Sequence, residues 1–103
     1  MKTFRDLEFN VNGWGGLNAK LKFDNGFTLS VVAGTSAYST PRESLPSPEL
    51  FQAFEVAVFN SDGEFTREFF SEDHNDDVLG WQDRSQIAEL MSRIQQHNLE
   101  ISK

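Results

Sequence analysis

Residues 17–33 have the sequence LNAKLKFDNGFTLSVVA, which contains the clearest hydrophobic pattern of the chain. Apolar and polar residues alternate from Leu17 to Phe23, and the alternation resumes from Phe27 to Ala33 beyond Asp24-Asn25-Gly26. A period of two residues is typical of a strand with one buried face. The stretch therefore predicts a β-hairpin over residues 17–33.

The length of the connecting loop sets the register of this hairpin. A two-residue Asn25-Gly26 loop would pair Lys22 with Leu29 and put the two apolar sets on opposite faces. A three-residue loop pairs Phe23 with Phe27, Leu21 with Leu29, and Ala19 with Val31. Because a slip of one residue turns every side chain over, we predict the three-residue loop, with Gly26 in the left-handed position.

Further elements are expected downstream. Residues 34–48 are rich in Ser, Thr and Pro and predict a long surface loop, which ends where Ser47 and Pro48 suit the cap and first position of one helical turn. The β-branched and aromatic residues of 54–59 favour a strand, and the turn residues 60–63 lead into another strand at 64–70. The register of this second hairpin stays open, because loops of three and of four residues both leave a mixed face.

The last expected element is a helix. Asp83 suits its N-cap, and Gln86 three residues later completes a capping-box pattern. One apolar stripe then follows at i, i+3, i+4 and i+7: Ile87, Leu90, Met91 and Ile94. We therefore expect one α+β domain over residues 1–103, an antiparallel sheet of about four strands with one C-terminal helix packed on a face.

Composition narrows the classes of function. The 103 residues include no cysteine, which excludes disulfides and thiolate metal ligands. The polar start of the chain predicts no secretory signal. No stretch approaches the roughly 18 apolar residues of a membrane span, so we expect a cytoplasmic protein without membrane contact.

The negative charge is concentrated in one region. Between Asp62 and Glu89, nine acidic residues stand against Arg67 and Arg84, and this excess equals the whole net charge of −7. Such a surface repels phosphate backbones and attracts basic partners, so we expect no direct nucleic-acid binding. The predicted partner-binding patch contains Glu68, Glu72, Asp73, Asp76 and Asp77. A solvated face that serves solubility alone is the open alternative.

The sequence contains no complete metal or catalytic motif. Asp73, Asn75 and Asp77 alternate like the first ligands of a calcium loop, but Val78 and Arg84 stand where that loop needs Gly and Glu. His74 and His97 have no metal-ligand or triad spacing. Glu55 and Glu68 could face each other across a hairpin, yet nothing brings an acid, a base and an electrophile stabiliser together. We expect no enzyme activity, no cofactor and no metal site.

Each of the two tryptophans is assigned an expected role. Trp14 stands among glycines in Asn12-Gly13-Trp14-Gly15-Gly16, where an exposed indole would serve as an interface anchor or would pack over a core edge. Trp81 precedes the helix, and we predict that it packs on the first turn against Ile87.

Several segments resemble small uncharacterised accessory proteins of tailed bacteriophages. The matching pieces lie within residues 23–95: Asn25-Gly26, Ser30-Val31, Gly34, Phe54-Glu55-Val56-Ala57-Val58, Asp62-Gly63 and, most specific, Asp77-Val78-Leu79-Gly80-Trp81. The first sixteen residues and the Pro-rich loop depart from the pattern. The resemblance implies a sheet with a C-terminal helix and supplies no activity and no site residues.

A phage origin would place the protein in the host cytoplasm and imply a class of task. Small acidic phage proteins often bind host machinery, including defence complexes with basic surfaces. The leading hypothesis is an inhibitor of a host defence or nucleic-acid-handling complex, of the anti-CRISPR kind, acting through protein–protein contacts. The alternatives are a protein that sequesters a nucleotide through Trp14 and its glycines, and a structural or assembly component of a virion. A homodimer is compatible with each.

Overall fold

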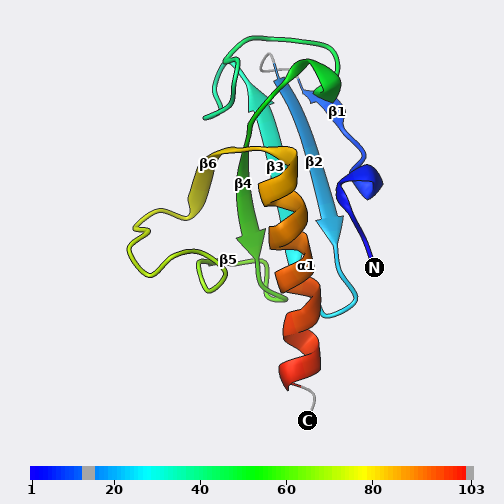
Figure 1. The fold of residues 1–103 in the computed structure, drawn as a ribbon, viewed down its shortest axis with the longest axis vertical. Coiled ribbons are helices and arrows are strands. Elements are labelled where there is room, and N and C mark those ends of the chain that lie inside the picture. Colours follow the sequence, from blue (N-terminus) through cyan, green and yellow to red (C-terminus); the bar gives the residue numbers. More distant parts are fainter. Residues whose placement is uncertain (13–15, 102–103) are drawn as a thin grey trace.

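The computed structural model describes residues 1–12 and 16–101 and shows an α+β fold, an antiparallel sheet with one C-terminal helix (Figure 1). The elements follow in the order η1 (Phe4–Asp6), β1 (Asn10–Asn12), β2 (Gly16–Lys22), β3 (Thr28–Gly34), η2 (Pro48–Leu50), β4 (Phe54–Phe59), β5 (Phe65–Thr66), β6 (Val78–Gln82) and α1 (Arg84–Ile101). Among the described residues, no helix is long and apolar enough to cross a membrane.

In the part of the chain that the structure describes, the sheet has six strands, more than the four or so that were predicted. Its order is β1-β2-β3-β4-β5, and β6 also pairs with β4. β5 lies opposite Val58 and Phe59, whereas β6 lies opposite residues 54–57. Because β3 occupies the other edge of β4, β5 and β6 share one edge and follow each other along it.

The hairpin of β2 and β3 confirms the predicted three-residue loop. Leu21 pairs with Leu29 and Ala19 with Val31, and the Phe23 amide donates to the Phe27 carbonyl over 2.8 Å. Gly26 has φ 97°, which is the left-handed conformation that the loop requires. The apolar residues of both strands therefore face the same side of the sheet.

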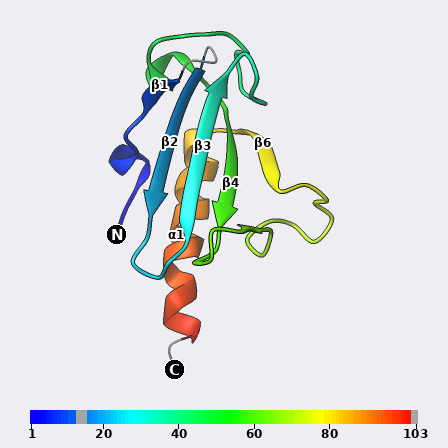
Figure 2. The same ribbon diagram turned by 180° about the vertical axis from the view of Figure 1, so that it is seen from behind.

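The helix α1 lies on that side and closes the core (Figure 1). The predicted capping box is confirmed: the Asp83 amide donates to Gln86 Oε1 over 2.9 Å, and the Gln86 amide donates to Asp83 Oδ1 over 2.8 Å. The predicted stripe of Ile87, Leu90, Met91 and Ile94 is buried. These side chains join the apolar residues of the sheet in one core. Seen from the opposite side, β2, β3 and β4 stand in front of α1 (Figure 2).

The segment before β4 is partly buried rather than a plain surface loop. Ala37 and Ser39 are buried, and the Ser39 hydroxyl donates to the Pro41 carbonyl over 2.9 Å. The predicted helical turn is present as η2 with Pro48 in its first position, but the Ser47 hydroxyl bonds the Glu49 carboxylate instead of capping the backbone.

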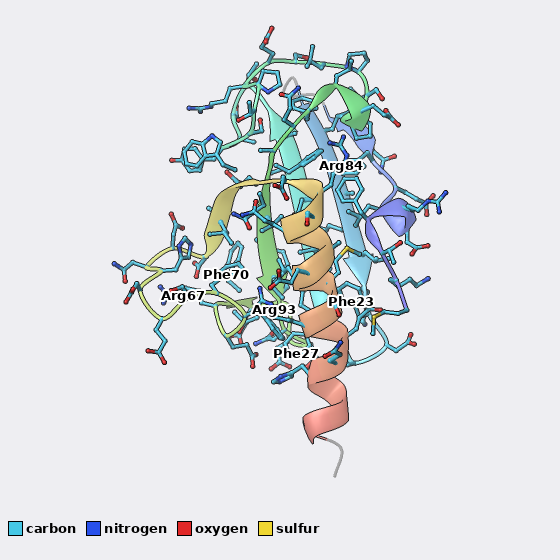
Figure 3. The ribbon with its side chains drawn as sticks, viewed as in Figure 1. Phe23, Phe27, Arg67, Phe70, Arg84 and Arg93 are labelled. Atoms are coloured by element: carbon cyan, nitrogen blue, oxygen red, sulfur yellow. The ribbon has the colours of Figure 1, made fainter. Side chains whose placement is uncertain are left out.

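Arg84 holds this segment to the start of α1 (Figure 3). Its guanidinium donates to the carbonyl oxygens of Phe51 over 2.8 Å and Pro48 over 2.6 Å. The same group lies 5.4 Å from the ring centre of Phe4 and 5.3 Å from that of Phe54. The residue that breaks the calcium-loop pattern thus joins three parts of the chain.

Candidate functional site

Residues 67–77, which we call the acidic loop, leave the edge of β4 and return to it. Thr66 at the end of β5 pairs with Val58, and Val78 at the start of β6 pairs with Ala57, the next residue of β4. The ends of the loop are therefore neighbours, as in the compact Ω-loops that often carry function. The strand predicted over 64–70 is wrong beyond Thr66.

The inner side of the acidic loop is packed against α1 and the β2–β3 turn. Phe69 is buried, with its ring edge-on to Phe27 at 5.1 Å and to His97 at 5.2 Å between ring centres. Arg93 reaches from α1 and donates from Nη1 to the Phe69 carbonyl oxygen over 2.6 Å (Figure 3). The chain cannot continue as a strand here, because Phe69 turns into the core and its carbonyl bonds the helix.

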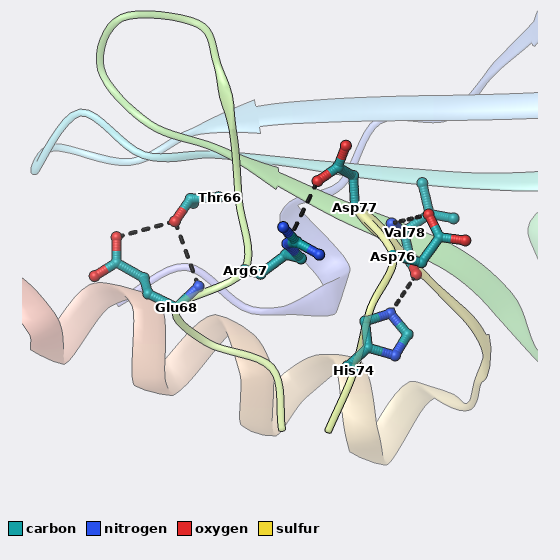
Figure 4. Close-up of polar contacts among 7 residues, drawn as sticks. All are labelled: Thr66, Arg67, Glu68, His74, Asp76, Asp77 and Val78. Atoms are coloured by element: carbon teal, nitrogen blue, oxygen red, sulfur yellow. Dashed lines mark hydrogen bonds and ion pairs between the residues drawn. The ribbon is translucent and has the colours of Figure 1, made fainter. Parts of the chain in front are cut away.

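The far limb of the loop is held by its own side chains (Figure 4). His74 Nε2 lies 2.6 Å from the Val78 carbonyl oxygen, and its ring contacts the Phe70 ring with centres 5.3 Å apart. Arg67 Nε and Asp77 Oδ1 are 3.7 Å apart and join the two limbs. The loop therefore has defined internal contacts at its start, middle and end.

All five carboxylates predicted to form the partner patch are exposed. Glu68 accepts a hydrogen bond from Thr66 and lies 3.4 Å from His97 Nε2, and Asp76 accepts from the Val78 amide over 3.3 Å. Within the described part of the chain, the carboxylates of Glu72 and Asp73 have no hydrogen-bonding or ionic partner. The structure thus brings the predicted acids into one loop and leaves these two facing solvent.

The side chains of the other candidate sites bond different groups and do not come together. Asp77 of the alternating Asp-Asn-Asp pattern is paired with Arg67. Across residues 1–12 and 16–101, no three His, Asp or Glu side chains are grouped as metal ligands. Glu55 accepts a hydrogen bond from the Tyr38 amide over 3.1 Å, whereas Glu68 lies at His97, so the two glutamates do not form a carboxylate pair.

Trp81 does not pack on Ile87 as predicted. The residue is 56% exposed, and its ring lies against that of Tyr38 with centres 5.1 Å apart. The Trp81 amide donates to the Tyr38 carbonyl over 2.9 Å. A Cβ on Gly80 would lie 2.7 Å from Tyr38 Cβ, so this glycine lets the tyrosine approach the strand.

Tyr38 and Trp81, which we call the aromatic pair, were not identified as a site from the sequence. Tyr38 lies in the long loop for which the sequence predicted no strand or helix. Its contact with β6 joins two segments that are distant in sequence. Trp14, the tryptophan predicted as an anchor, lies outside the described residues. The adjacent Gly80-Trp81 was the one local signal for a close backbone approach.

Comparisons of the chain with protein-family models, with curated proteins and with solved structures give no significant match.

Proposed function

We propose that this protein binds a basic surface of a host nucleic-acid-handling or defence complex through its acidic loop and thereby inhibits that complex. The observation that carries the proposal is the loop itself, which presents exposed carboxylates on a backbone held at both ends. Its cation Arg67 is engaged with Asp77, and Arg93 is engaged with a backbone carbonyl. The carboxylates of Glu72 and Asp73 remain for a partner.

Preorganisation of the loop favours binding over mere solubility. Charged side chains that serve solubility need no fixed backbone, whereas a partner gains affinity when the loop is already ordered. Here the buried ring of Phe69 and the bond from Arg93 fix one limb, and His74 fixes the other. The net charge of −7 adds electrostatic steering toward a basic partner.

The aromatic pair supplies an anchor close to the charges. Trp81 follows Asp77 by four residues in an extended strand, so the two lie within about 13 Å along the chain. Both fit within one ordinary protein interface, which covers roughly 800 Å² on each partner. An exposed tryptophan beside a polar rim is the usual form of an interface hot spot.

Inhibition follows from the sign of the charge. A complex that handles nucleic acid presents lysines and arginines to phosphates, and fixed carboxylates compete for the same groups. The resemblance of residues 23–95 to phage accessory proteins is the reason for proposing a bacterial complex as the target. Competition of this kind weakens as salt rises, because both partners are charged and exposed.

Charge reversal with a matched control tests the proposal. Tagged wild type, Glu72→Lys/Asp73→Lys and Glu8→Lys/Glu43→Lys are used to capture partners from bacterial lysate at low and high salt. The two double variants change the net charge equally, and all four carboxylates are exposed. We expect wild type and the Glu8/Glu43 variant to retain one nucleic-acid-handling complex, and the loop variant to lose it.

Two further readouts complete this test. The retained complex should be released by duplex DNA and by salt, and its activity on nucleic acid should fall when wild type is added. If both double variants retained the complex equally, the acidic loop would not be its binding site. Capture of no such complex by wild type would count against the proposed function as a whole.

A further inference from the structure

One face of the sheet is turned away from α1 (Figure 2). The strand registers place a row of side chains across four strands on this face. Lys22 of β2 pairs with Thr28 of β3, Thr28 pairs with Phe59 of β4, and Phe59 pairs with Phe65 of β5. Directly paired residues point to the same face, so a lysine, a hydroxyl and two aromatic rings stand side by side. Lys20 and Ser30 begin the next row.

A shallow depression of about 300 Å³ lies over the Lys22, Thr28 and Phe59 part of this row. Phe65 stands beside Phe59, outside the lining of the depression. Its lining includes Lys20, Lys22, Thr28, Phe59, Asn60 and Ser61. The two charged residues of this lining are both lysines, although the net charge of the protein is −7. The local positive charge is thus set apart from the acidic loop, which packs on the helix side through Phe69.

The aromatic rings offer a stacking surface next to the lysines. Phe59 and Phe65 lie with ring centres 4.6 Å apart at 34°, and Phe65 is 49% exposed. Lys20 Nζ lies 5.3 Å from the centre of the Phe59 ring. A planar ligand can stack on this pair while its anionic end reaches an ammonium group.

From this juxtaposition we infer a binding site for a nucleoside monophosphate on the open face of the sheet. The base stacks on Phe59 and Phe65, the phosphate is held by Lys20 and Lys22, and Thr28, Asn60 and Ser61 offer polar groups to the sugar. Lys22 and Phe59 are two strands apart, which is about 10 Å between backbones and matches the span from base to phosphate once the lysine side chain reaches inward.

The acidic residues around the depression favour a small ligand with few negative charges over a polynucleotide. Asp24 and Asp62 stand in the turns that flank the depression, and Glu64 follows the second turn. A polynucleotide would have to pass these acids and would be repelled by the net negative charge. One phosphate on two lysines is compensated locally, whereas a long phosphate chain is not. The inference is independent of the proposed protein partner, which binds elsewhere.

Amide NMR titration of the full chain tests this site. The probes are adenosine monophosphate, adenosine, inorganic phosphate and an oligothymidylate single strand. The proteins are wild type, Lys20→Gln/Lys22→Gln, and Lys2→Gln/Arg5→Gln as the control with the same change of charge. All four cations are exposed, so both variants keep the fold, and their spectra verify this.

We expect adenosine monophosphate to shift the amides of residues 20–22, 28 and 59–61 of wild type. Loss of both lysines should weaken binding by about tenfold or more, and the control variant should stay within about twofold. Adenosine and phosphate alone should each bind at least about tenfold more weakly than the monophosphate.

Three outcomes would overturn the inference. The first is no shift of these amides with the monophosphate at millimolar concentration. The second is equal binding by wild type and the Lys20/Lys22 variant. The third is tighter binding of the single strand than of the monophosphate, which would mark the face as a surface for polynucleotides.

Discussion

Trp81 occupies the left-handed region of backbone space, with φ 53°. A residue with a bulky side chain is strained there, and such strain persists only where the surroundings fix it. In this protein the fixing groups are the Tyr38 carbonyl, which accepts the Trp81 amide, and the Tyr38 ring, which contacts the indole. The strained residue is also half exposed, which fits a role in binding better than a role in the core.

Substitution of Trp81 separates backbone strain from ring contact. Trp81→Ala and Trp81→Gly both lose the indole, but only glycine adopts φ 53° freely. We therefore expect Trp81→Gly to be more stable than Trp81→Ala by about 1 kcal/mol in urea denaturation. Both variants should lose the captured complex described above, because both lack the anchor.

Phe65 provides the control for this comparison. It is similarly exposed but lies in a regular strand, where glycine costs about 0.5–1 kcal/mol relative to alanine. The order of the two variants should therefore be reversed, with Phe65→Ala the more stable. If alanine were also the more stable residue at position 81, the left-handed strain would be absent in solution.

At the scale of elements, local patterns predicted the parts whose partners are close in sequence. The three-residue turn followed from keeping Leu21 and Leu29 on one face, and the start of α1 followed from Asp83 and Gln86. β6 was missed because Gly80 and the bulge opposite β4 interrupt any alternation. β1 was missed because Asn10-Val11-Asn12 is mostly polar and is a strand only through its pairing with β2.

The charges of the acidic loop could be predicted from the sequence, but its anchoring could not. The composition of residues 67–77 identified the acids, and the structure places them together. The anchoring by Arg93 and His97 could not be predicted, because both residues are more than 20 positions away from Phe69 in sequence. Arg93 bonds the Phe69 carbonyl oxygen, and His97 contacts the Phe69 ring and the Glu68 carboxylate. The charges of a loop are thus visible in its own sequence, whereas the residues that anchor it are distant in the chain.

Arg93 is expected to stabilise the attachment of the loop to α1. Arg93→Met keeps an apolar stem and removes the bond to the Phe69 carbonyl, which should lower the free energy of unfolding by about 1–2 kcal/mol. Glu89→Gln is the control, since it removes the 3.9 Å exposed ion pair with Arg93 but leaves the carbonyl bond. Its effect should stay within about 0.5 kcal/mol. Urea denaturation measures both, and equal losses would mean that the carbonyl bond contributes nothing.

At the scale of the whole molecule, the two proposed sites lie on different sides of one sheet. The acidic loop packs on α1 and on the edge of β4, and α1 leaves the other face of the sheet open (Figures 1 and 2). The residues that line the depression lie on this open face. A chain with a net charge of −7 thus keeps two lysines together and away from the carboxylates of Glu72 and Asp73. Under the two proposals, this separation would let an acidic protein bind a phosphate and a basic partner at the same time.

Such a separation predicts that the sites act independently. Glu72→Lys/Asp73→Lys should bind adenosine monophosphate within about threefold of wild type at 0.15 M salt. Two strand spacings, about 10 Å, separate β2 with its lysines from β4, whose outer edge holds the loop. Exposed charges farther apart than about 8 Å are largely screened at this salt concentration. Lys20→Gln/Lys22→Gln should capture the same complex as wild type, since effects of distant and unconnected sites add. The NMR titration measures the first effect and the capture assay measures the second. A tenfold change in either crossed measurement would mean that the loop and the depression form one surface, and the binding of protein and nucleotide would then compete.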